Sequence, residues 1–187
     1  MTLKRFGFMV LTTVAVGMLV GVLHSLTDIF ANIRLFFGFE VGGFVSATAL
    51  MGFWAYLTLN FIVKGFLPQR LWHWVQAFLI LVVYVDMIYL RYITAGQGTG
   101  SVWPYVGFAT WPLVIALIVA YVKSKVSGKK AFIPAVFFLY VFTTIEWYVA
   151  LKFGSATGET GLTIMIGTIL LACNSYLILL LGRIIRE

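Results

Sequence analysis

The sequence predicts an all-α integral membrane protein, a six-transmembrane helix bundle with both termini in the cytoplasm. Of its 187 residues, 62% are hydrophobic and 10% are charged, and the mean hydropathy is +1.04. A soluble domain of this composition would lack the polar residues needed to cover its surface. The sequence also contains apolar stretches long enough to span a bilayer, and basic residues lie in alternate connections between them, which is typical of a multi-pass membrane protein.

Six apolar segments account for most of the chain. A hydrocarbon core about 30 Å thick requires about 20 helical residues at a rise of about 1.5 Å each. The connections are short and contain glycine, proline or serine, so we expect a single transmembrane domain over residues 1–187. The predicted spans are residues 6–26, 39–63, 71–93, 105–122, 131–151 and 162–181.

The first three segments each have a recognisable beginning or end. The segment 6–26 follows Lys4 and Arg5 and resembles a signal sequence. It is longer than a signal h-region and no A-x-A-like cleavage site follows, so we expect it to be retained as a helix. Turn-forming residues at 65–68 and 96–100 end the second and third segments.

The last three segments are separated by polar connections. The fourth segment contains Trp111 and Pro112, and a proline inside a helix frees a carbonyl and favours a kink. Residues 127–128 separate the fourth segment from the fifth, and residues 154–158 separate the fifth from the sixth. The sequence therefore predicts six helices joined by short connections.

The distribution of lysine and arginine predicts the orientation in the cell membrane. Cytoplasmic connections of membrane proteins carry the excess of basic residues. The six spans place ten of the thirteen basic residues on one side and three on the other, which puts both termini in the cytoplasm. The ten are Lys4, Arg5, Lys64, Arg70, Lys123, Lys125, Lys129, Lys130, Arg183 and Arg186, and the three are Arg34, Arg91 and Lys152.

Two carboxylates lie inside predicted spans, where an ionisable group is unfavourable and is therefore a functional candidate. Asp86 and Glu146 are at corresponding positions of the third and fifth segments, so we expect similar depth in the outer half of the bilayer. Asp86 also shares a helical line with Trp72 and Gln76, which predicts an inward stripe. Such carboxylates serve either to fix helix register or to take part in ligand, proton or signal chemistry.

Arg91 is a candidate partner for one of these carboxylates. It lies about 140° around the helix from Asp86, so pairing within the third segment is unfavourable. Glu146 is closest in predicted depth, and we therefore expect an interhelical Arg91–Glu146 ion pair. Asn174, near the middle of the sixth segment, is expected to form a hydrogen bond between helices.

Three further groups of residues suggest contacts with helices, lipid or a partner. Gly17 and Gly21 form a G-x-x-x-G pattern that would seat another helix, of the same bundle or of a partner protein. Tryptophans near span ends are expected to anchor the chain at the membrane interfaces rather than to form a ligand cage. These are Trp54, Trp72, Trp74, Trp103 and Trp147. The basic connection satisfies the orientation rule and would attract anionic lipid or an acidic partner. Its members are Lys123, Lys125, Lys129 and Lys130.

Motifs of enzymes and cofactor sites are absent from the sequence. It contains no H-E-x-x-H, C-x-x-C, P-loop, G-x-S-x-G or kinase motif. His24 and His73 are predicted on opposite sides of the membrane, and Cys173 has no second cysteine to pair with. We therefore expect no enzymatic activity, metal or cofactor. Since the basic residues flank membrane spans, we also expect no nucleic-acid partner.

Several stretches with polar residues at fixed spacings resemble the KinB-signalling pathway activation (KbaA) family of spore-forming bacilli. The resemblance extends from the second segment to the sixth, and the 129–135 and 144–147 stretches carry most weight. The stretches are residues 51–58, Leu71-Trp72 with Val75-Gln76, Asp86 with Tyr89 and Arg91-Tyr92, residues 129–135 including Pro134, Thr144-Ile145-Glu146-Trp147, and Cys173-Asn174-Ser175-Tyr176. Tyr148 and the connections 26–40 and 154–161 depart from the family pattern.

The resemblance implies a role upstream of a sporulation phosphorelay, in which the protein promotes the activity of the membrane sensor histidine kinase KinB. It implies no catalytic residues. The first hypothesis is accordingly a non-enzymatic regulator that contacts kinase transmembrane helices and biases the kinase between two states. The alternative is a small-solute-binding membrane subunit or transporter, with a pocket in the outer half of the bundle. That pocket would comprise Trp72, Gln76, Asp86 and Glu146.

Overall fold

The computed structural model describes residues 3–27, 35–94, 96–157 and 160–184, and these ranges are helical apart from short connections. Six of the rods are long and apolar enough to cross a membrane, as the sequence predicts. The elements are α1 Leu3–Leu26, α2 Leu35–Phe66, α3 Gln69–Thr94, α4 Trp103–Ser127, the 3-10 turn η2 Lys129–Ala131, α5 Phe132–Phe137, the π-helical turn η3 Phe138–Phe142, α6 Thr143–Thr157 and α7 Thr160–Ile184.

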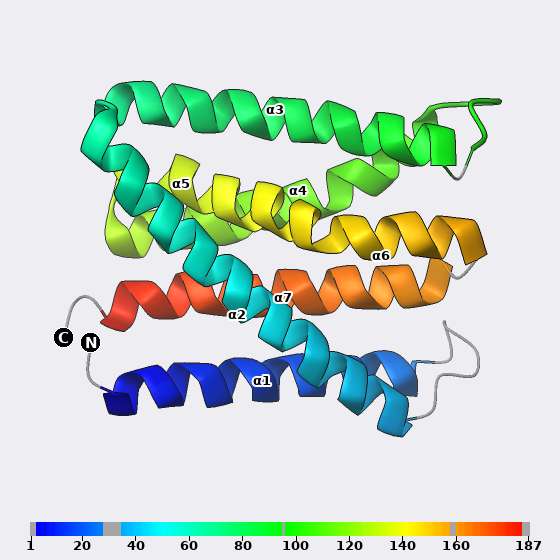
Figure 1. Cartoon of the computed structure of the whole chain (residues 1–187), viewed down its shortest axis with the longest axis horizontal. Coiled ribbons are helices and arrows are strands. Elements are labelled where there is room, and N and C mark those ends of the chain that lie inside the picture. Colours follow the sequence, from blue (N-terminus) through cyan, green and yellow to red (C-terminus); the bar gives the residue numbers. More distant parts are fainter. Residues whose placement is uncertain (1–2, 28–34, 95, 158–159, 185–187) are drawn as a thin grey trace.

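The rods alternate in direction, so corresponding ends gather at two ends of the bundle (Figure 1). The start of α1, the connections α2–α3 and α4–η2 and the end of α7 lie at the same end, on the left of the view. The α3–α4 connection lies at the opposite end. Six consecutive helices that each cross a membrane would place their ends in this way. Arg34 and Arg186, which contribute to the predicted orientation, lie outside the described residues.

Helix α2 is the longest element and crosses the bundle obliquely (Figure 1). Its 32 residues correspond to about 48 Å, more than a hydrocarbon core of about 30 Å, so a tilt is needed to keep its apolar surface in the bilayer. The tilt carries α2 from its contact with α1 across α7 to the beginning of α3.

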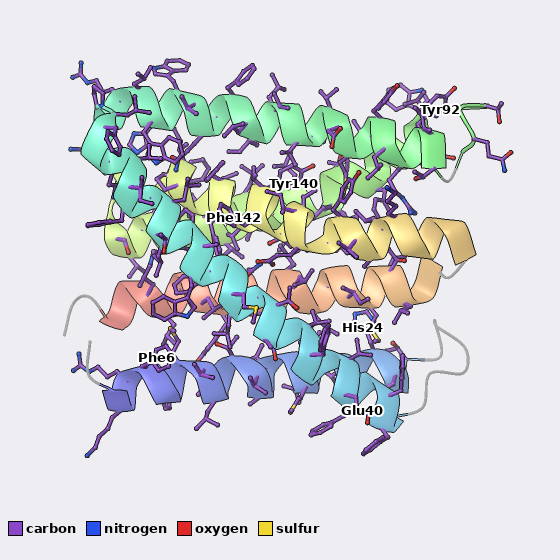
Figure 2. The ribbon with its side chains drawn as sticks, in the orientation of Figure 1. Phe6, His24, Glu40, Tyr92, Tyr140 and Phe142 are labelled. Atoms are coloured by element: carbon purple, nitrogen blue, oxygen red, sulfur yellow. The ribbon has the colours of Figure 1, made fainter. Side chains whose placement is uncertain are left out.

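The fifth span is built from four consecutive pieces, η2, α5, η3 and α6. A π-helical turn contains one more residue than an α-helical turn, and it rotates the residues that follow by about 100° relative to a regular α-helix. The segment η3 ends at Phe142, immediately before Thr143 and four residues before Glu146. Its Tyr140 is buried and its hydroxyl donates a hydrogen bond to the Ala109 carbonyl of α4, 3.2 Å away (Figure 2).

Two apolar clusters fill the bundle, one toward each end. The first is centred on Phe53 of α2, Trp72 of α3 and Phe137 of α5. The second is centred on Trp147 of α6 and contains Ile169 of α7. Helix α3 lies at one edge of the bundle (Figure 1). Only 11% of its most apolar 18-residue stretch is buried, compared with 56% for the corresponding stretch of the fifth span. The interior therefore consists mainly of α2, α7 and the fifth span, in which every residue from Ala135 to Val141 is buried.

Candidate functional site

A polar cluster lies between the two apolar clusters, where α6 meets α7. The Asn174 side-chain amide donates hydrogen bonds to Thr143 Oγ1, 2.9 Å away, and to Glu146 Oε2, 2.8 Å away. Asn174 is fully buried, and it follows Cys173 of one apolar cluster and precedes Leu177 of the other. Asn174 therefore forms the expected interhelical hydrogen bonds, with the carboxylate of Glu146 as one acceptor.

Two oxygens of this cluster remain without a hydrogen bond. Glu146 Oε1 and Asn174 Oδ1 are both inaccessible and have no partner among the described residues. A carboxylate in an apolar interior is stabilised by hydrogen bonds or by protonation. The cluster fixes α6 against α7 through one amide and leaves two acceptors facing the interior.

Gly52 of α2 positions Glu146. A Cβ atom at residue 52 would overlap Glu146 Oε1, so only glycine allows the carboxylate to lie against α2. Three helices, α2, α6 and α7, thus meet at this side chain. The sequence did not single out Gly52 as a site residue, although it lies in the 51–58 stretch that carries the family resemblance.

A layer of small polar side chains continues from this cluster toward α1. Thr13 and Ser46 are fully buried, and the Cys173 thiol lies 3.8 Å from the Thr13 carbonyl oxygen. A Cβ atom on Gly17 would lie 3.2 Å from Cys173 Sγ. Small residues of this kind allow helix backbones to approach closely where lipid supplies no hydrophobic driving force.

Trp147 is a central packing residue rather than an interfacial anchor. Its side chain is 1% exposed, and its indole N–H donates to the Thr163 carbonyl, 2.6 Å away. The ring lies on Gly167 of α7, where a Cβ atom would collide with the indole. The anchor assignment is therefore wrong for Trp147, and also for buried Trp72; Trp54, Trp74 and Trp103 are exposed.

The expected Arg91–Glu146 ion pair does not form. The Arg91 guanidinium lies 4.4 Å from the centre of the Phe108 ring, which stacks in turn on Trp147 at 5.2 Å. Glu146 faces α2 and α7, whereas Arg91 faces α4. Similar depth in the bundle does not bring Arg91 and Glu146 together, because the two side chains point toward different neighbouring helices.

Trp72 and Gln76 lie inside the first apolar cluster, as the predicted stripe requires. The Trp72 indole N–H donates to Asn60 Oδ1 on α2, 3.0 Å away, and the ring meets Phe137 edge-on. Gln76 is fully buried, and neither amide atom has a hydrogen-bond partner among the described residues. Trp72 therefore holds α3 against α2 and α5, whereas the buried amide of Gln76 is an unsatisfied polar group beside this contact.

Asp86 does not belong to this stripe, because it lies on the exposed face of α3. The buried residues of α3 are Trp72, Gln76, Met87 and Arg91, so the inward line reaches Met87, one residue beyond Asp86. One residue corresponds to about 100° of rotation. The predicted pocket of Trp72, Gln76, Asp86 and Glu146 is therefore not assembled, since Asp86 lies outside the bundle.

The glycine pair on α1 is used within the chain. Gly17 and Gly21 pack against Gly42 and Gly38 of α2, which form a second G-x-x-x-G pattern. A Cβ atom on Gly17 would lie 2.6 Å from the Gly42 carbonyl oxygen. Of the two partners that the sequence left open, the structure favours another helix of the same bundle, so this face is not available to a foreign protein.

The four lysines predicted as one basic patch are divided between interior and surface. The Lys123 ammonium is buried and donates to the Ile178 carbonyl of α7, 2.6 Å away. Lys125 lies over the ring of Tyr121, and its side chain is exposed, as are those of Lys129 and Lys130. The surface patch therefore contains three lysines, while Lys123 fastens α4 to α7. No group of three metal-ligating side chains occurs among the described residues.

Stretches that carry the family resemblance meet in space. Tyr56 of the 51–58 stretch donates to the Pro134 carbonyl of the 129–135 stretch, 3.3 Å away. Gly52, Glu146 and Asn174 belong to three different stretches and form one contact. The polar residues that resemble the family thus hold the helices to one another.

The described residues form a helical bundle with six helices long and apolar enough to cross a membrane and with an internal polar cluster. Within that class, the chain belongs to the family described as KinB-signalling pathway activation in sporulation, whose profile matches residues 6–184. The KinB-signaling pathway activation protein of Bacillus subtilis (strain 168) is 34% identical over 150 residues, covering 80% of this chain and 74% of the relative. No solved structure matches the chain. The family resemblance drawn from the sequence is confirmed.

Proposed function

We propose that this chain is a multi-pass protein of the cell membrane that promotes the activity of the sensor histidine kinase KinB, and so the phosphorelay that leads to sporulation. The observation that carries this proposal is the family match, which extends over residues 6–184 and hence over all six candidate spans. The relative from Bacillus subtilis bears the same description by name.

The proposed orientation places both termini in the cytoplasm. The end of the bundle that contains the start of α1 and the end of α7 also contains the α2–α3 and α4–η2 connections, where most basic residues lie (Figure 1). Anionic inner-leaflet lipid attracts basic residues next to membrane spans. A reporter that is active only in the cytoplasm should give activity when it is fused at residue 67 or 128. A reporter that is active only outside the membrane should give activity when it is fused at residue 98.

The proposed mode of action is non-enzymatic. A regulator shifts a kinase between states only to the extent that it binds those states with different affinity, and about 1 to 3 kcal/mol is typical of such coupling. The polar groups at the centre of this bundle hold α2, α6 and α7 together. We assign them to scaffold stability and the regulatory contact to the outer surface.

A complementation experiment tests this function. The gene is expressed in Bacillus subtilis that lacks its own KinB-signaling pathway activation protein, once with KinB present and once without it. We expect sporulation frequency and a phosphorelay-dependent reporter to recover only when KinB is present. Recovery without KinB, or no recovery from a chain that reaches the membrane, would contradict the proposal.

The solute-binding alternative has less support. It required four side chains around one pocket, and Asp86 is exposed, about 100° around α3 from buried Met87. Buried polar atoms without a hydrogen bond among the described residues still favour it, namely Glu146 Oε1, Asn174 Oδ1 and both amide atoms of Gln76. A solute retained through purification and lost in the Glu146→Gln variant would favour this alternative.

A further inference from the structure

Helix α3 presents the least buried face of the six candidate spans. Only 11% of its most apolar 18-residue stretch is buried. The helix lies at the edge of the bundle opposite α1 (Figure 1). Its inner side packs against α4 and α5. The outer side of α3 is therefore available to lipid or to another transmembrane helix.

The exposed residues of α3 follow a helical seam. Trp74, Phe78, Leu81, Val85 and Tyr89 are 57% to 76% exposed. Their spacings of four, three, four and four residues place them along one side of the helix. A continuous seam of this kind is the geometry with which two helices pack side by side.

Asp86 lies beside this seam and distinguishes it from a lipid-facing surface. Its carboxylate is exposed and forms no hydrogen bond or ion pair within the part of the chain that the structure describes. It lies eight residues, about 12 Å, before the end of α3 at Thr94. An aspartate side chain is too short to reach the interface from that depth, and carboxylates in spans normally face protein or water.

The charge of Asp86 indicates which kind of helix would pack on the α3 seam. An unpaired carboxylate in hydrocarbon is stabilised most by a basic side chain at the same depth. A second copy of this chain, related by an axis along the membrane normal, would bring two α3 helices together at equal depth but would not supply that basic side chain, because Arg91, the basic residue of α3 closest to Asp86 in depth, is buried inside its own bundle. Both Asp86 carboxylates would then lack a basic partner, which disfavours that dimer.

We propose that the α3 seam, with Asp86, is the docking surface for a transmembrane helix of a partner protein that presents a basic side chain at the depth of Asp86. This inference rests on the proposed function in one respect, namely that the partner is the kinase KinB. It replaces the Gly17/Gly21 face, which α2 occupies. It also provides a contact inside the bilayer rather than at the lysine-rich connection.

Site-specific photo-crosslinking tests the surface. Val85 is replaced by p-benzoylphenylalanine in the full chain, which is co-expressed with epitope-tagged KinB in sporulating Bacillus subtilis. The matched control carries the same probe at Leu19 of α1, which is 61% exposed, compared with 57% for Val85, and lies at a similar depth on the opposite edge. We expect at least about tenfold more KinB adduct from the probe at 85.

The role of Asp86 is tested by substitution on the same probe-bearing chain. We expect Asp86→Leu to lower the adduct yield about tenfold while the amount of protein in the membrane stays unchanged. Asp86→Asn, which keeps shape and hydrogen-bonding capacity, should give an intermediate yield. Mass spectrometry of the adduct should identify a basic residue on the cross-linked helix, and exchanging the two charges should restore the yield that Asp86→Lys removes.

The outcomes separate this inference from the proposed function. If the wild-type chain restores KinB-dependent signalling but Asp86→Leu restores it equally and forms equal adduct, the docking surface is wrong and the function stands. Adducts only with a second copy or only with lipid, or a cross-linked helix without a basic residue, would also overturn the inference. If the wild-type chain restores nothing although it reaches the membrane, the proposed function itself fails.

Discussion

The two edges of the bundle differ in how far their helices are covered by other helices of the chain. At one edge, α1 and α2 are in backbone contact through Gly17, Gly21, Gly38 and Gly42. At the other edge, α3 exposes a seam of large apolar side chains to its surroundings. The first edge is complete within the chain, because small residues already seat a helix there. The second has the surface that a further helix would cover.

The two carboxylates sharpen this contrast. Glu146 lies among Gly52, Thr143 and Asn174, and its Oε2 accepts a hydrogen bond. Asp86 lies at the surface without such a partner. An unpaired charge at the centre of a transmembrane helix disfavours insertion by roughly 3 kcal/mol. The Glu146 carboxylate thus shares a hydrogen bond with another helix of its own bundle through one oxygen, whereas the Asp86 carboxylate shares none among the described residues.

The largest effect is expected for Trp147→Ala in the interior. Removing this buried ring leaves a cavity against Phe108 and Gly167, and we expect a loss of about 3 to 5 kcal/mol in the free energy of unfolding. The matched control is Trp74→Ala on the 76% exposed seam, which should change stability by less than about 0.5 kcal/mol. Denaturation of the purified protein in detergent measures both. Equal losses would remove the contrast between interior and seam.

Gly21→Leu should be the next most harmful change. The added side chain meets the Gly38 backbone, which cannot move without separating α1 from α2. We expect a loss of about 3 kcal/mol and a lower amount of protein in the membrane. Gly7→Leu is the control on the same helix, since a Cβ atom at that position meets nothing within 4 Å. A neutral Gly21→Leu would show that α1 and α2 do not pack through these glycines.

Asn174→Ala should have a smaller effect, about 1 kcal/mol, because it removes two interhelical hydrogen bonds in an apolar environment. A double-mutant cycle with Glu146→Leu isolates the contact. We expect Asn174→Ala to destabilise the Glu146→Leu background by about 0.5 kcal/mol less than it destabilises the wild type, because the hydrogen bond to Thr143 is lost in both backgrounds. Additive losses would mean that the amide and the carboxylate do not interact.

Asp86→Leu should have the smallest effect on the isolated protein. Because Asp86 has no partner in the described structure, we expect its stability in detergent to stay within about 0.5 kcal/mol of the wild type. Glu146→Leu, which leaves Asn174 without its carboxylate partner, should lose about 1 to 3 kcal/mol in the same assay. A loss from Asp86→Leu as large as that from Glu146→Leu would contradict the division of the two carboxylates.

The number and order of the six candidate spans could be predicted from the sequence because apolar length and turn residues determine them, whereas the 32-residue length of α2 and the division of the fifth span were not predicted. Glu146 and Asn174 were identified as candidates for the same reason, since polar residues are conspicuous in apolar segments. Their pairing was not predictable, because α6 and α7 are apolar on most sides and the sequence does not define which way each side chain faces.

Two further features were beyond the sequence for a geometric reason. The predicted stripe on α3 included Asp86, whereas the buried face passes through Met87, and an error of one residue turns a side chain by about 100°. The π-helical turn η3 produces a similar rotation ahead of Glu146, and no glycine or proline within Phe138–Phe142 announces it. Gly52 was visible in the sequence, but its role depends on Glu146 lying opposite.

The position of α7 has a consequence for biosynthesis. This helix follows the other described helices in the chain, yet it contacts α1, α2, α4 and α6. Until it is inserted, Glu146 has no amide donor, Trp147 has no Gly167 surface beneath it, and Lys123 has no Ile178 carbonyl. The described bundle is therefore completed only after α7 has been synthesised, when this helix packs against α1. Chains truncated before Thr160 would lack these contacts and would be substrates for membrane quality control.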